Sequence, residues 1–320
     1  MSEWKEYQLK ELTSKIGSGS TPKGGGNSYK DEGISLIRSQ NILDYKFSIN
    51  GLAYIDEVQA NVLKNVSVEE HDILLNITGD SVARCCNAPK ELLPARVNQH
   101  VAIIRSNIKL LDNNFLKYSL IDSKEELLSL SEIGGTRNAL TKGMLESFVI
   151  KLPSLPEQKA IVSVLSSLDN KIDLLHRQNK TLESMAETLF RQWFVEEAQN
   201  DWEEKTLADF GKVVCGKTPS KKKSEYYGND IPFLKIPDMH GRVFISSTED
   251  NLSLLGAESQ LNKLLPEGSL CVSCIATVGL VCITSKPMQT NQQINSIIPK
   301  SSKYLYFLFL LMKSINDELH

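Results

Sequence analysis

The hydrophobic residues between Ile161 and Trp193 recur at alternating steps of four and three, which is the pattern of a coiled-coil helix. The members of this seam are Ile161, Leu165, Leu168, Ile172, Leu175, Asn179, Leu182, Ala186, Leu189 and Trp193. Pro153 and Pro156 lie where a helix can begin, and neither Pro nor Gly interrupts the residues that follow. At about 1.5 Å per residue the helix is roughly 60 Å long, so we expect it to act as a spacer.

The two sequences that flank this seam resemble each other. Trp4, Leu9, Gly19, Thr21-Pro22, Ile34 and Asn98-Gln99 recur in the same order as Trp202, Leu207, Gly216, Thr218-Pro219, Ile231 and Asn291-Gln292. The separation between paired positions shrinks slowly along the chain, as it does for two copies of one domain with different loop lengths. We therefore predict a first domain over residues 1–151, a spacer helix over 152–197 and a second domain over 198–320.

Within the first copy, apolar and β-branched runs predict strands over residues 34–38, 71–78 and 97–105, and a helical period follows from 115 to 130. The second copy repeats this order at residues 231–235, 268–284 and 304–312. The fold class is therefore α+β, with two similar mixed domains joined by a long coiled-coil helix. Nothing after residue 312 matches residues 134–152, so we expect the second domain to be incomplete at its C-terminal end.

Composition narrows the class of protein. A hydrophobic fraction of 41% is sufficient for two cores. No run of eighteen apolar residues occurs and the first residues are polar and charged, so we expect a cytoplasmic protein with no membrane partner. Six irregularly spaced Cys do not form a disulfide framework. With a net charge of −3, any nucleic-acid site must depend on positive charge gathered on one face.

The sequence contains two motifs that suggest chemistry, and we interpret neither as a site. Gly211–Thr218 matches the phosphate-loop pattern, but Pro219 follows at once and no amphipathic helix begins there. Cys271 and Cys274 lie in an expected strand, where positions three apart point to opposite faces, so we interpret them as buried thiols and predict no metal site. The five His are scattered and accompany no nucleophile motif. The chain is therefore predicted to be non-catalytic.

Polar residues at strand ends and in loops suit the reading of DNA bases and phosphates. The candidates are Arg38, Gln40, Asn41, Arg84, Arg96, Arg137 and Asn138 in the first copy, and Lys217, Lys235 and Arg242 in the second. For each of them the alternative is an ordinary solvated loop. Asn98-Gln99 and Asn291-Gln292 occur in both copies, so we expect them to hold the shared fold together. Asn179 on the apolar seam is expected to fix helix register.

The segment Leu152-Pro-Ser-Leu-Pro-Glu-Gln-Lys-Ala-Ile161 resembles the segment that enters the conserved helix of type I restriction-modification specificity subunits. The Trp-x4-Leu starts, the Thr-Pro loops and Gly134-Gly-Thr-Arg-Asn-Ala-Leu-Thr141 support this resemblance. It covers the chain from Trp4 onward. The chain thus resembles a specificity subunit that is truncated within its second target-recognition domain.

This resemblance implies a DNA-binding, non-catalytic subunit of a phage-defence system, in which each target-recognition domain reads one half of a split site in double-stranded DNA. It also implies partners: methyltransferase subunits that carry S-adenosylmethionine, and restriction subunits that use ATP and Mg. This chain itself is expected to bind no cofactor. The alternative that we keep open is a coiled-coil adaptor whose two globular ends bind proteins.

A further expectation concerns the seam. In the family the conserved helices pair antiparallel, and here a second copy of the chain could supply the partner helix. The pairing residues would be Leu165, Leu168, Ile172, Leu175, Asn179, Leu182 and Leu189. Asn179 lies near the middle, so a symmetric antiparallel pair would place it opposite itself.

Overall fold

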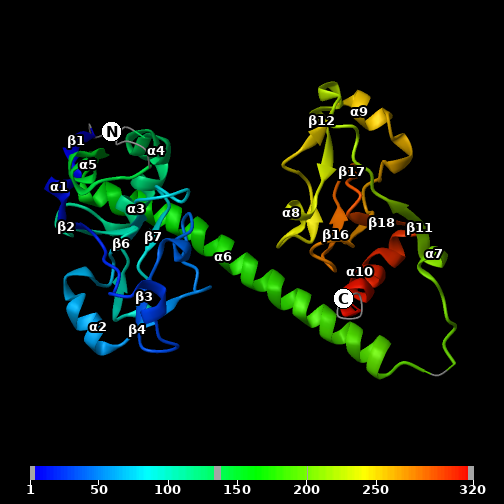
Figure 1. The fold of residues 1–320 in the computed structure, drawn as a ribbon, viewed down its shortest axis with the longest axis horizontal. Coiled ribbons are helices and arrows are strands. Elements are labelled where there is room, and N and C mark those ends of the chain that lie inside the picture. The colour runs from blue at the N-terminus through cyan, green and yellow to red at the C-terminus, as the bar shows by residue number, and fades with distance from the viewer. Residues whose placement is uncertain (1–3, 133–137, 200, 316–320) are drawn as a thin grey trace. The chain divides into compact units, whose positions relative to one another are not determined.

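The computed structural model describes residues 4–132, 138–199 and 201–315. The chain divides into two compact units, Met1–Asp173 and Leu174–His320, and helix α6 (Leu155–Arg191) contributes to both (Figure 1). The sequence predicted the helix as a separate segment between two domains, whereas the division between the compact units falls within it.

The first unit is built from two four-stranded sheets, a two-stranded sheet formed by its first and last strands, and a group of helices. Its elements are β1 (Lys5–Gln8), α1 (Leu9–Leu12), β2 (Thr13–Ser18), β3 (Ile34–Ile37), β4 (Ala53–Ile55), α2 (Glu57–Val62), β5 (Ser67–Val68), β6 (Ile73–Asn76), β7 (Cys85–Asn87), β8 (Ala95–Val97), β9 (Val101–Ser106), α3 (Asn113–Asp122), α4 (Lys124–Glu132), α5 (Lys142–Ser147) and β10 (Val149–Leu152). The first sheet is antiparallel, in the order β2-β9-β6-β7. The second has the order β4-β3-β8-β5, and its β3 and β8 are parallel.

The second unit repeats this arrangement. Its elements are α7 (Leu207–Phe210), β11 (Gly211–Cys215), β12 (Tyr227–Leu234), α8 (Ile236–Met239), β13 (Phe244–Ile245), β14 (Asn251–Leu252), α9 (Leu254–Glu258), β15 (Leu270–Ser273), β16 (Val281–Thr284), β17 (Gln289–Thr290), β18 (Ile294–Pro299) and α10 (Leu305–Ser314). The sheet orders are β11-β18-β15-β16-β13 and β14-β12-β17, and β12 and β17 are parallel. The duplication predicted from the sequence is therefore present in the topology: β2-β9-β6-β7 corresponds to β11-β18-β15-β16, and β4-β3-β8 corresponds to β14-β12-β17. Strands β5 and β13 are the additions that differ between the two units.

Each unit has two hydrophobic cores, one between its sheets and one between the larger sheet and the helices. In the first unit the helical core includes Leu140, Leu145 and Phe148, which lie in or beside α5. In the second unit the equivalent core is formed by the larger sheet and α10. The helical cores of the two units are therefore closed by different segments.

Helix α6 starts where the sequence predicted. The carbonyl of Ser154 accepts a hydrogen bond from the Gln158 amide at 2.9 Å, which closes the first turn. The Gln158 side chain is buried against the first unit, where it donates to the carbonyls of Leu110 (3.1 Å) and Pro153 (3.0 Å). Farther along the helix, Asp169 pairs with Lys117 of α3 at 3.2 Å. These contacts attach the beginning of α6 to the first unit.

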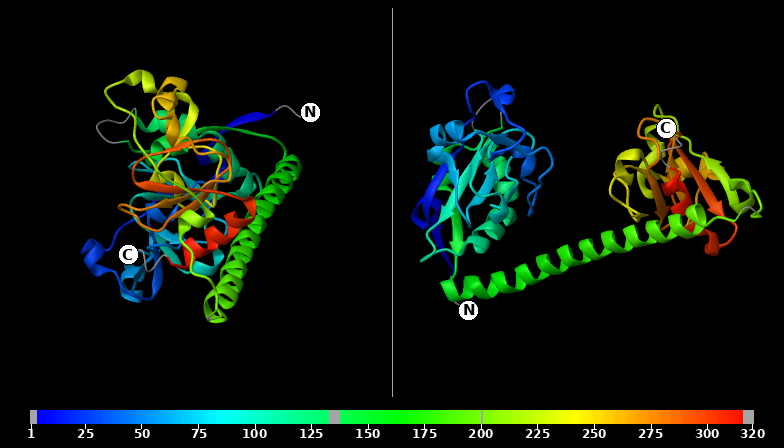
Figure 2. Two further views of the ribbon diagram at one scale, coloured as in Figure 1. Left: turned by 90° about the vertical axis from the view of Figure 1, so that its right-hand side faces the viewer. Right: turned by 90° about the horizontal axis from the view of Figure 1, so that it is seen from below.

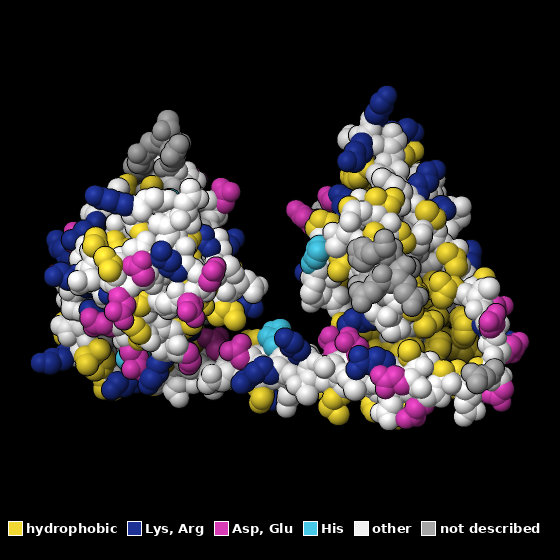
Figure 3. Space-filling model, turned by 60° about the horizontal axis from the view of Figure 1, so that its bottom comes forward, with side chains coloured by type: hydrophobic (Ala, Val, Ile, Leu, Met, Phe, Trp, Pro, Cys, Tyr) yellow, Lys and Arg dark blue, Asp and Glu magenta, His cyan; other side chains and the backbone are white. Residues whose placement is uncertain are grey.

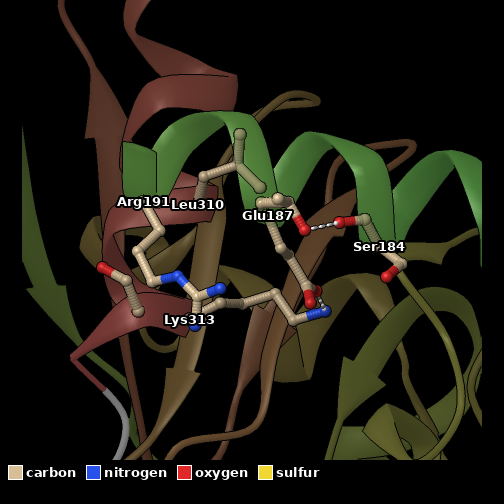
Figure 4. A pocket seen from close by; sticks show the side chains of 7 residues that line it. Ser184, Glu187, Arg191, Leu310 and Lys313 are labelled. Carbon is tan, nitrogen blue, oxygen red and sulfur yellow. Dashed lines mark hydrogen bonds and ion pairs between the residues drawn. The ribbon is translucent and has the colours of Figure 1, made fainter. Parts of the chain in front are cut away.

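The C-terminal turns of α6 pack within the second unit. Phe190 is buried, and its ring lies 5.0 Å from that of Phe194 and 5.5 Å from that of Phe307 in α10. Glu187 forms an ion pair with Lys313 of α10, at the edge of a shallow pocket of about 280 Å³ (Figure 4). Aromatic packing and this ion pair together hold α10 against α6.

The central part of α6 is solvent-exposed on every side from residue 171 to residue 185. Both views of Figure 2 show α6 as an unbroken helix. The prediction of one long helix bearing an apolar seam is therefore confirmed, and its large side chains, among them Leu168, Ile172, Leu175 and Leu182, are exposed. Among the described residues, none of the helices combines the length and the apolar character that crossing a membrane requires.

The cysteines agree with the sequence interpretation in part. Cys271 is buried in β15, as expected, but Cys274 lies just beyond the strand and is exposed, so the prediction of two buried thiols was wrong for Cys274. Burial raises the pKa of Cys85 and of Cys86 to about 12. Within the described ranges no group of three or more His, Cys, Asp or Glu is arranged to hold a metal ion.

Candidate nucleic-acid interface

Four chain segments of the first unit meet at one edge of its sheets. The amide of Ser20, just after β2, donates to the carbonyl of Val97 at 3.0 Å, and the amide of Asn98 donates to that of Ile37 at 3.0 Å. Because β3 and β8 are parallel, their carboxyl ends lie at this same edge. We call it the first loop edge, formed by residues 19–30, 38–41, 78–84 and 98–100.

The second unit has the same edge. The amide of Lys217, just after β11, donates to the carbonyl of Thr290 at 2.9 Å, and the amide of Asn291 donates to that of Leu234 at 3.2 Å. We call it the second loop edge, formed by residues 216–226, 235–242, 274–279 and 291–293. The two edges are therefore equivalent in backbone geometry, although the loops that leave them differ in sequence.

A glycine is required at the same place in both edges. A Cβ atom added to Gly19 would lie 2.1 Å from the carbonyl oxygen of Val97, and one added to Gly216 would lie 2.0 Å from that of Asn291. Such distances are far inside van der Waals contact, so no other residue fits without a shift of the backbone. This close approach explains why both copies carry Gly at this position.

Asn98 and Asn291 have equivalent structural roles. Both are buried, and their side-chain oxygens accept hydrogen bonds at 3.1 Å from the amides of His100 and Gln293. The expectation that this repeated pair holds the shared fold is confirmed for the two asparagines. The neighbouring Gln99 and Gln292 are exposed at the loop edges instead.

Arg38 and Lys235 occupy equivalent positions directly after β3 and β12. The Arg38 guanidinium donates to the carbonyl of Gly51 and lies over the Tyr29 ring, 5.4 Å from its centroid. No carboxylate among the described residues pairs with it. Lys235, in contrast, forms an ion pair with Asp250. The equivalent backbone position thus carries a cation without an acidic partner among the described residues of the first unit, and an ion-paired cation in the second.

Gln40 and Asn41 follow Arg38 but differ in accessibility. Gln40 is exposed and donates to the carbonyl of Gly51 at 3.0 Å. Asn41 is completely buried, and its side-chain amide donates to the carbonyls of Ser48 (3.0 Å) and Asn50 (3.1 Å). Asn41 holds the loop that carries Arg38 and cannot reach a base, so the prediction that it contacts DNA is wrong.

Arg84 and Arg96 lie in different surroundings. Arg84 is half-buried in the turn after β6, and the buried Asn76 ties this turn to the first loop edge by donating to Ser81 at 3.0 Å and to the Ser39 carbonyl at 2.9 Å. The Arg96 side chain points to α2, where Nε donates to the Ala60 carbonyl at 3.0 Å. Burial lowers the pKa of Arg96. Arg96 therefore links β8 to α2, and its role as a DNA contact stays a prediction.

The remaining candidates are divided between the two units. Arg137 lies outside the described residues, and Asn138 is exposed beside Ala139, which forms a bridge with Thr78 of the first loop edge. In the second unit Lys217 is exposed, and Arg242 is exposed while donating to the Ser247 carbonyl at 3.1 Å. Both belong to the second loop edge.

The structure does not support a phosphate loop at Gly211–Thr218. Residues Gly211–Cys215 form strand β11, and the residues after it continue into the second loop edge without beginning a helix. A phosphate loop needs a helix that opens at its Lys-Thr pair, so that backbone amides face the phosphates. This geometry agrees with the interpretation that the motif is not a phosphate-binding site.

Comparison with known proteins identifies the family. The family model described as "Type I restriction modification DNA specificity domain" matches residues 1–184 and 199–319, so it covers both units. The chain belongs to this specificity family. It is 31% identical to the HindI specificity subunit of Haemophilus influenzae, over 98% of this chain and 83% of that protein. It is 24% identical to the putative MjaX specificity subunit of Methanocaldococcus jannaschii, over 76% of this chain and 61% of that protein.

A solved structure shares the fold. The type I restriction-modification S subunit of M. genitalium aligns with a TM-score of 0.56 at 15% identity, over 99% of this chain and 78% of that one. The two segments that match the specificity family are separated by residues 185–198, which contain the end of α6. Family membership and the repeated loop edges therefore describe the same duplication.

Other polar residues of the loop edges of this specificity protein are exposed as well. Gln99 and Gln292 were interpreted as parts of the shared fold, but their side chains are exposed. In the second unit, Lys221, Lys222 and Lys223 follow Lys217 in one exposed loop. Lys223 donates to the Tyr226 hydroxyl at 3.0 Å, and this bond raises the pKa of Lys223. Figure 3 shows several Lys and Arg side chains at the upper end of the second unit.

Proposed function

We propose that the chain is the sequence-reading subunit of a type I restriction-modification complex, and that each loop edge reads one half of a split DNA target. One observation carries this proposal: equivalent positions of one backbone frame carry different polar side chains in the two units. Arg38 and Gln40 of the first edge correspond to Lys235 and Pro237 of the second. A shared frame with different side chains suits two readers of two different half-sites.

The chemistry of the edges favours contact with DNA. The Arg38 guanidinium has no acidic partner among the described residues, so it can donate to a guanine edge or to a phosphate. The loop Lys221–Lys223 offers cations that suit phosphate contacts, which position a protein on the duplex without reading sequence. We therefore assign base reading mainly to Arg38 and Gln40, and backbone contact mainly to the lysine loop.

We infer that methylation and cleavage are performed by partner subunits. On this proposal, methyltransferase subunits supply S-adenosylmethionine, restriction subunits supply ATP and Mg, and this chain determines where they act. Membership in the specificity family supports this division of roles. The chain itself contributes the two loop edges and the continuous helix α6 between them.

We also propose that the exposed seam of α6 pairs with the α6 helix of a second copy of the chain. Large apolar side chains that stand in water along one helix indicate a partner surface, and 61% of the Leu182 surface is exposed. In an antiparallel pair Asn179 would meet Asn179 of the second copy, which fixes register. The adaptor alternative differs from this model because it requires no DNA contact at either loop edge.

Sequencing of methylated bases tests the proposal most directly. Cells that express the chain with its methyltransferase should carry a split methylation motif that is absent without the chain. Replacement of Arg38 by Ala should change or relax bases in one half of the motif only, whereas Arg177→Ala, an exposed arginine of α6, should leave the motif unchanged. A motif that is the same with and without the chain would contradict the proposal.

Salt dependence separates DNA recognition from the adaptor alternative. Binding to duplex DNA should weaken steeply as salt rises, because bound counterions are released from the phosphates. Removal of one phosphate contact, by Lys222→Ala, should reduce the slope of log K against log salt by about 0.9. Undetectable DNA binding at low salt, combined with retained protein binding, would favour the adaptor.

A further inference from the structure

Gln99 and Gln292 occupy equivalent positions at the two loop edges. Each follows the buried asparagine of its edge, Asn98 or Asn291, and each side chain is exposed to solvent. A glutamine side chain ends in an amide with two different groups, a carbonyl oxygen that accepts hydrogen bonds and an NH2 group that donates them. The group that the protein itself binds determines which group remains for a ligand.

In the first unit the protein binds the NH2 group. Gln99 Nε2 lies 3.1 Å from His100 Nε2, and because an amide nitrogen does not accept hydrogen bonds, it must be the donor. The neutral His100 ring then carries its proton on Nδ1, which lies 2.6 Å from Thr78 Oγ1. In this orientation of the amide, the Gln99 oxygen accepts from no described residue and is free for a ligand.

In the second unit the protein binds the carbonyl oxygen instead. Gln292 Oε1 accepts from the Thr218 hydroxyl at 2.6 Å, and the Gln292 NH2 group donates to no described residue. The next residue, Gln293, is bound elsewhere, because its side-chain oxygen accepts from the buried Asn291 at 2.8 Å. The second edge therefore leaves a donor free where the first edge leaves an acceptor.

Two equivalent threonines show the same contrast. Thr21 and Thr218 each lie two residues after the glycine of their edge, Gly19 or Gly216. The Thr21 hydroxyl is buried and has no hydrogen-bond partner in the described part of the first unit, whereas the Thr218 hydroxyl is bound to Gln292. The threonine thus holds the glutamine in one unit only, and in the other unit the histidine that follows the glutamine holds it.

We propose that Gln99 and Gln292 contact DNA through opposite ends of the same amide group, an inference that rests on the proposed function. The free oxygen of Gln99 accepts from an exocyclic amino group of adenine or cytosine, since phosphates offer only acceptors. The free NH2 group of Gln292 donates to an acceptor on a base edge or on a phosphate. His100 and Thr218 are positioning residues that set the two orientations. One residue type, repeated in both units, therefore selects different groups on DNA.

Replacement of each glutamine by glutamate tests the two orientations, because a carboxylate has acceptors only. We would measure the affinity of the full chain, in complex with its methyltransferase, for duplexes that carry every base at each position of the motif. Both variants add one negative charge, so that effect is common to them. Gln99→Glu should keep its preference for a base with an exocyclic amino group. Gln292→Glu should lose about tenfold more affinity than Gln99→Glu, because its free donor is replaced by an acceptor.

The pattern of the Gln292→Glu loss identifies the group that Gln292 contacts. A loss confined to one base position assigns the contact to a base edge. A loss that is equal for all sequences, with a smaller dependence on salt, assigns it to a phosphate. Gln178→Glu, in the exposed part of α6, is the matched control and should change neither affinity nor base preference.

Variants of the positioning residues test the orientations separately. Thr218→Val removes the hydroxyl that holds Gln292 and should reproduce part of the Gln292→Glu loss, whereas Thr218→Ser should retain the parent affinity. His100→Ala should relax the preference at one position of the first half-site. Thr21→Val removes the equivalent hydroxyl that has no described partner, so it should leave the first half-site unchanged.

Three results would overturn the inference. They are equal losses in the Gln99→Glu and Gln292→Glu variants, a larger loss in Gln99→Glu, and no loss in either variant beyond that of the added charge. The proposed function would remain if the split motif still depended on the chain and still changed with Arg38→Ala. A motif that does not depend on the chain would contradict the proposed function itself.

Discussion

A heptad inserted into α6 tests whether the helix sets the distance between the two DNA half-sites. We would duplicate residues 172–178 directly after Gln178. All residues from 171 to 185 are exposed, so the insertion disturbs no packing in either unit. The seven residues also preserve the apolar period of the seam, so the helix should remain continuous.

The size of the effect follows from helix geometry. Seven residues lengthen the helix by about 10.5 Å, which corresponds to about three base pairs at 3.4 Å per base pair. The insertion turns the end of the helix by only about 20°. Three base pairs rotate the second half-site around the DNA axis by roughly 100°. We therefore expect a longer preferred gap, bound with lower affinity because the two rotations differ.

The assay compares binding to duplexes that share both half-sites and differ in the number of base pairs between them. The parent chain should prefer one gap, and the insertion variant should prefer a gap about three base pairs longer. In the control variant, residues 172–178 are replaced by a different heptad that keeps apolar residues at the same positions. This variant should keep the parent gap because the helix length is unchanged. If the insertion variant keeps the parent gap with full affinity, α6 does not measure the distance.

Other predictions concern single contacts. Phe190→Ala should destabilise the second unit by about 3–5 kcal/mol, because a large buried ring is removed, and calorimetry would detect a lowered transition temperature for that unit. Asp72→Ala leaves the half-buried Arg105 without its bidentate partner and should cost about 3 kcal/mol in urea unfolding; unchanged stability would refute this role. Gly216→Ala should destabilise only the second unit, by about 1–3 kcal/mol, as measured by local hydrogen exchange. Leu175→Lys should abolish self-association in sedimentation, and a persisting dimer would show that the seam is not the interface.

The contact between Arg105 and Asp72 illustrates what periodicity does not reveal. Asp72 is completely buried, and both of its carboxylate oxygens accept from Arg105, at 2.7 Å and 2.9 Å. Arg105 keeps a raised pKa because of this bond. The two residues are far apart in sequence and come together only because β6 and β9 are neighbours in the sheet. Sequence alone therefore offered no reason to single them out.

The candidate interface shows the same limit at individual residues. Arg38, Asn41 and Arg96 are all polar residues at or near strand ends, and the sequence placed them in one class. The structure separates them by their partners. Arg38 has no acidic partner among the described residues. The Asn41 side chain donates hydrogen bonds to two carbonyls of its own loop, and Arg96 donates to a carbonyl of α2. Exposure and hydrogen-bond partners depend on loops that return from elsewhere in the chain, which a linear pattern does not contain.

The sequence by itself determined the repeated domain, the continuous helix and the family. These features follow from local periodicity and from motifs that recur in order, so they are present in the sequence itself. Only the tertiary structure decided which polar groups are available at the loop edges and which apolar face of the second unit is open. Both depend on contacts between segments distant in sequence, as the difference between the buried Ile16 of β2 and the exposed Val213 at the equivalent position of β11 shows. Equivalent residues in a duplicated sequence have different roles when the segments that cover them differ.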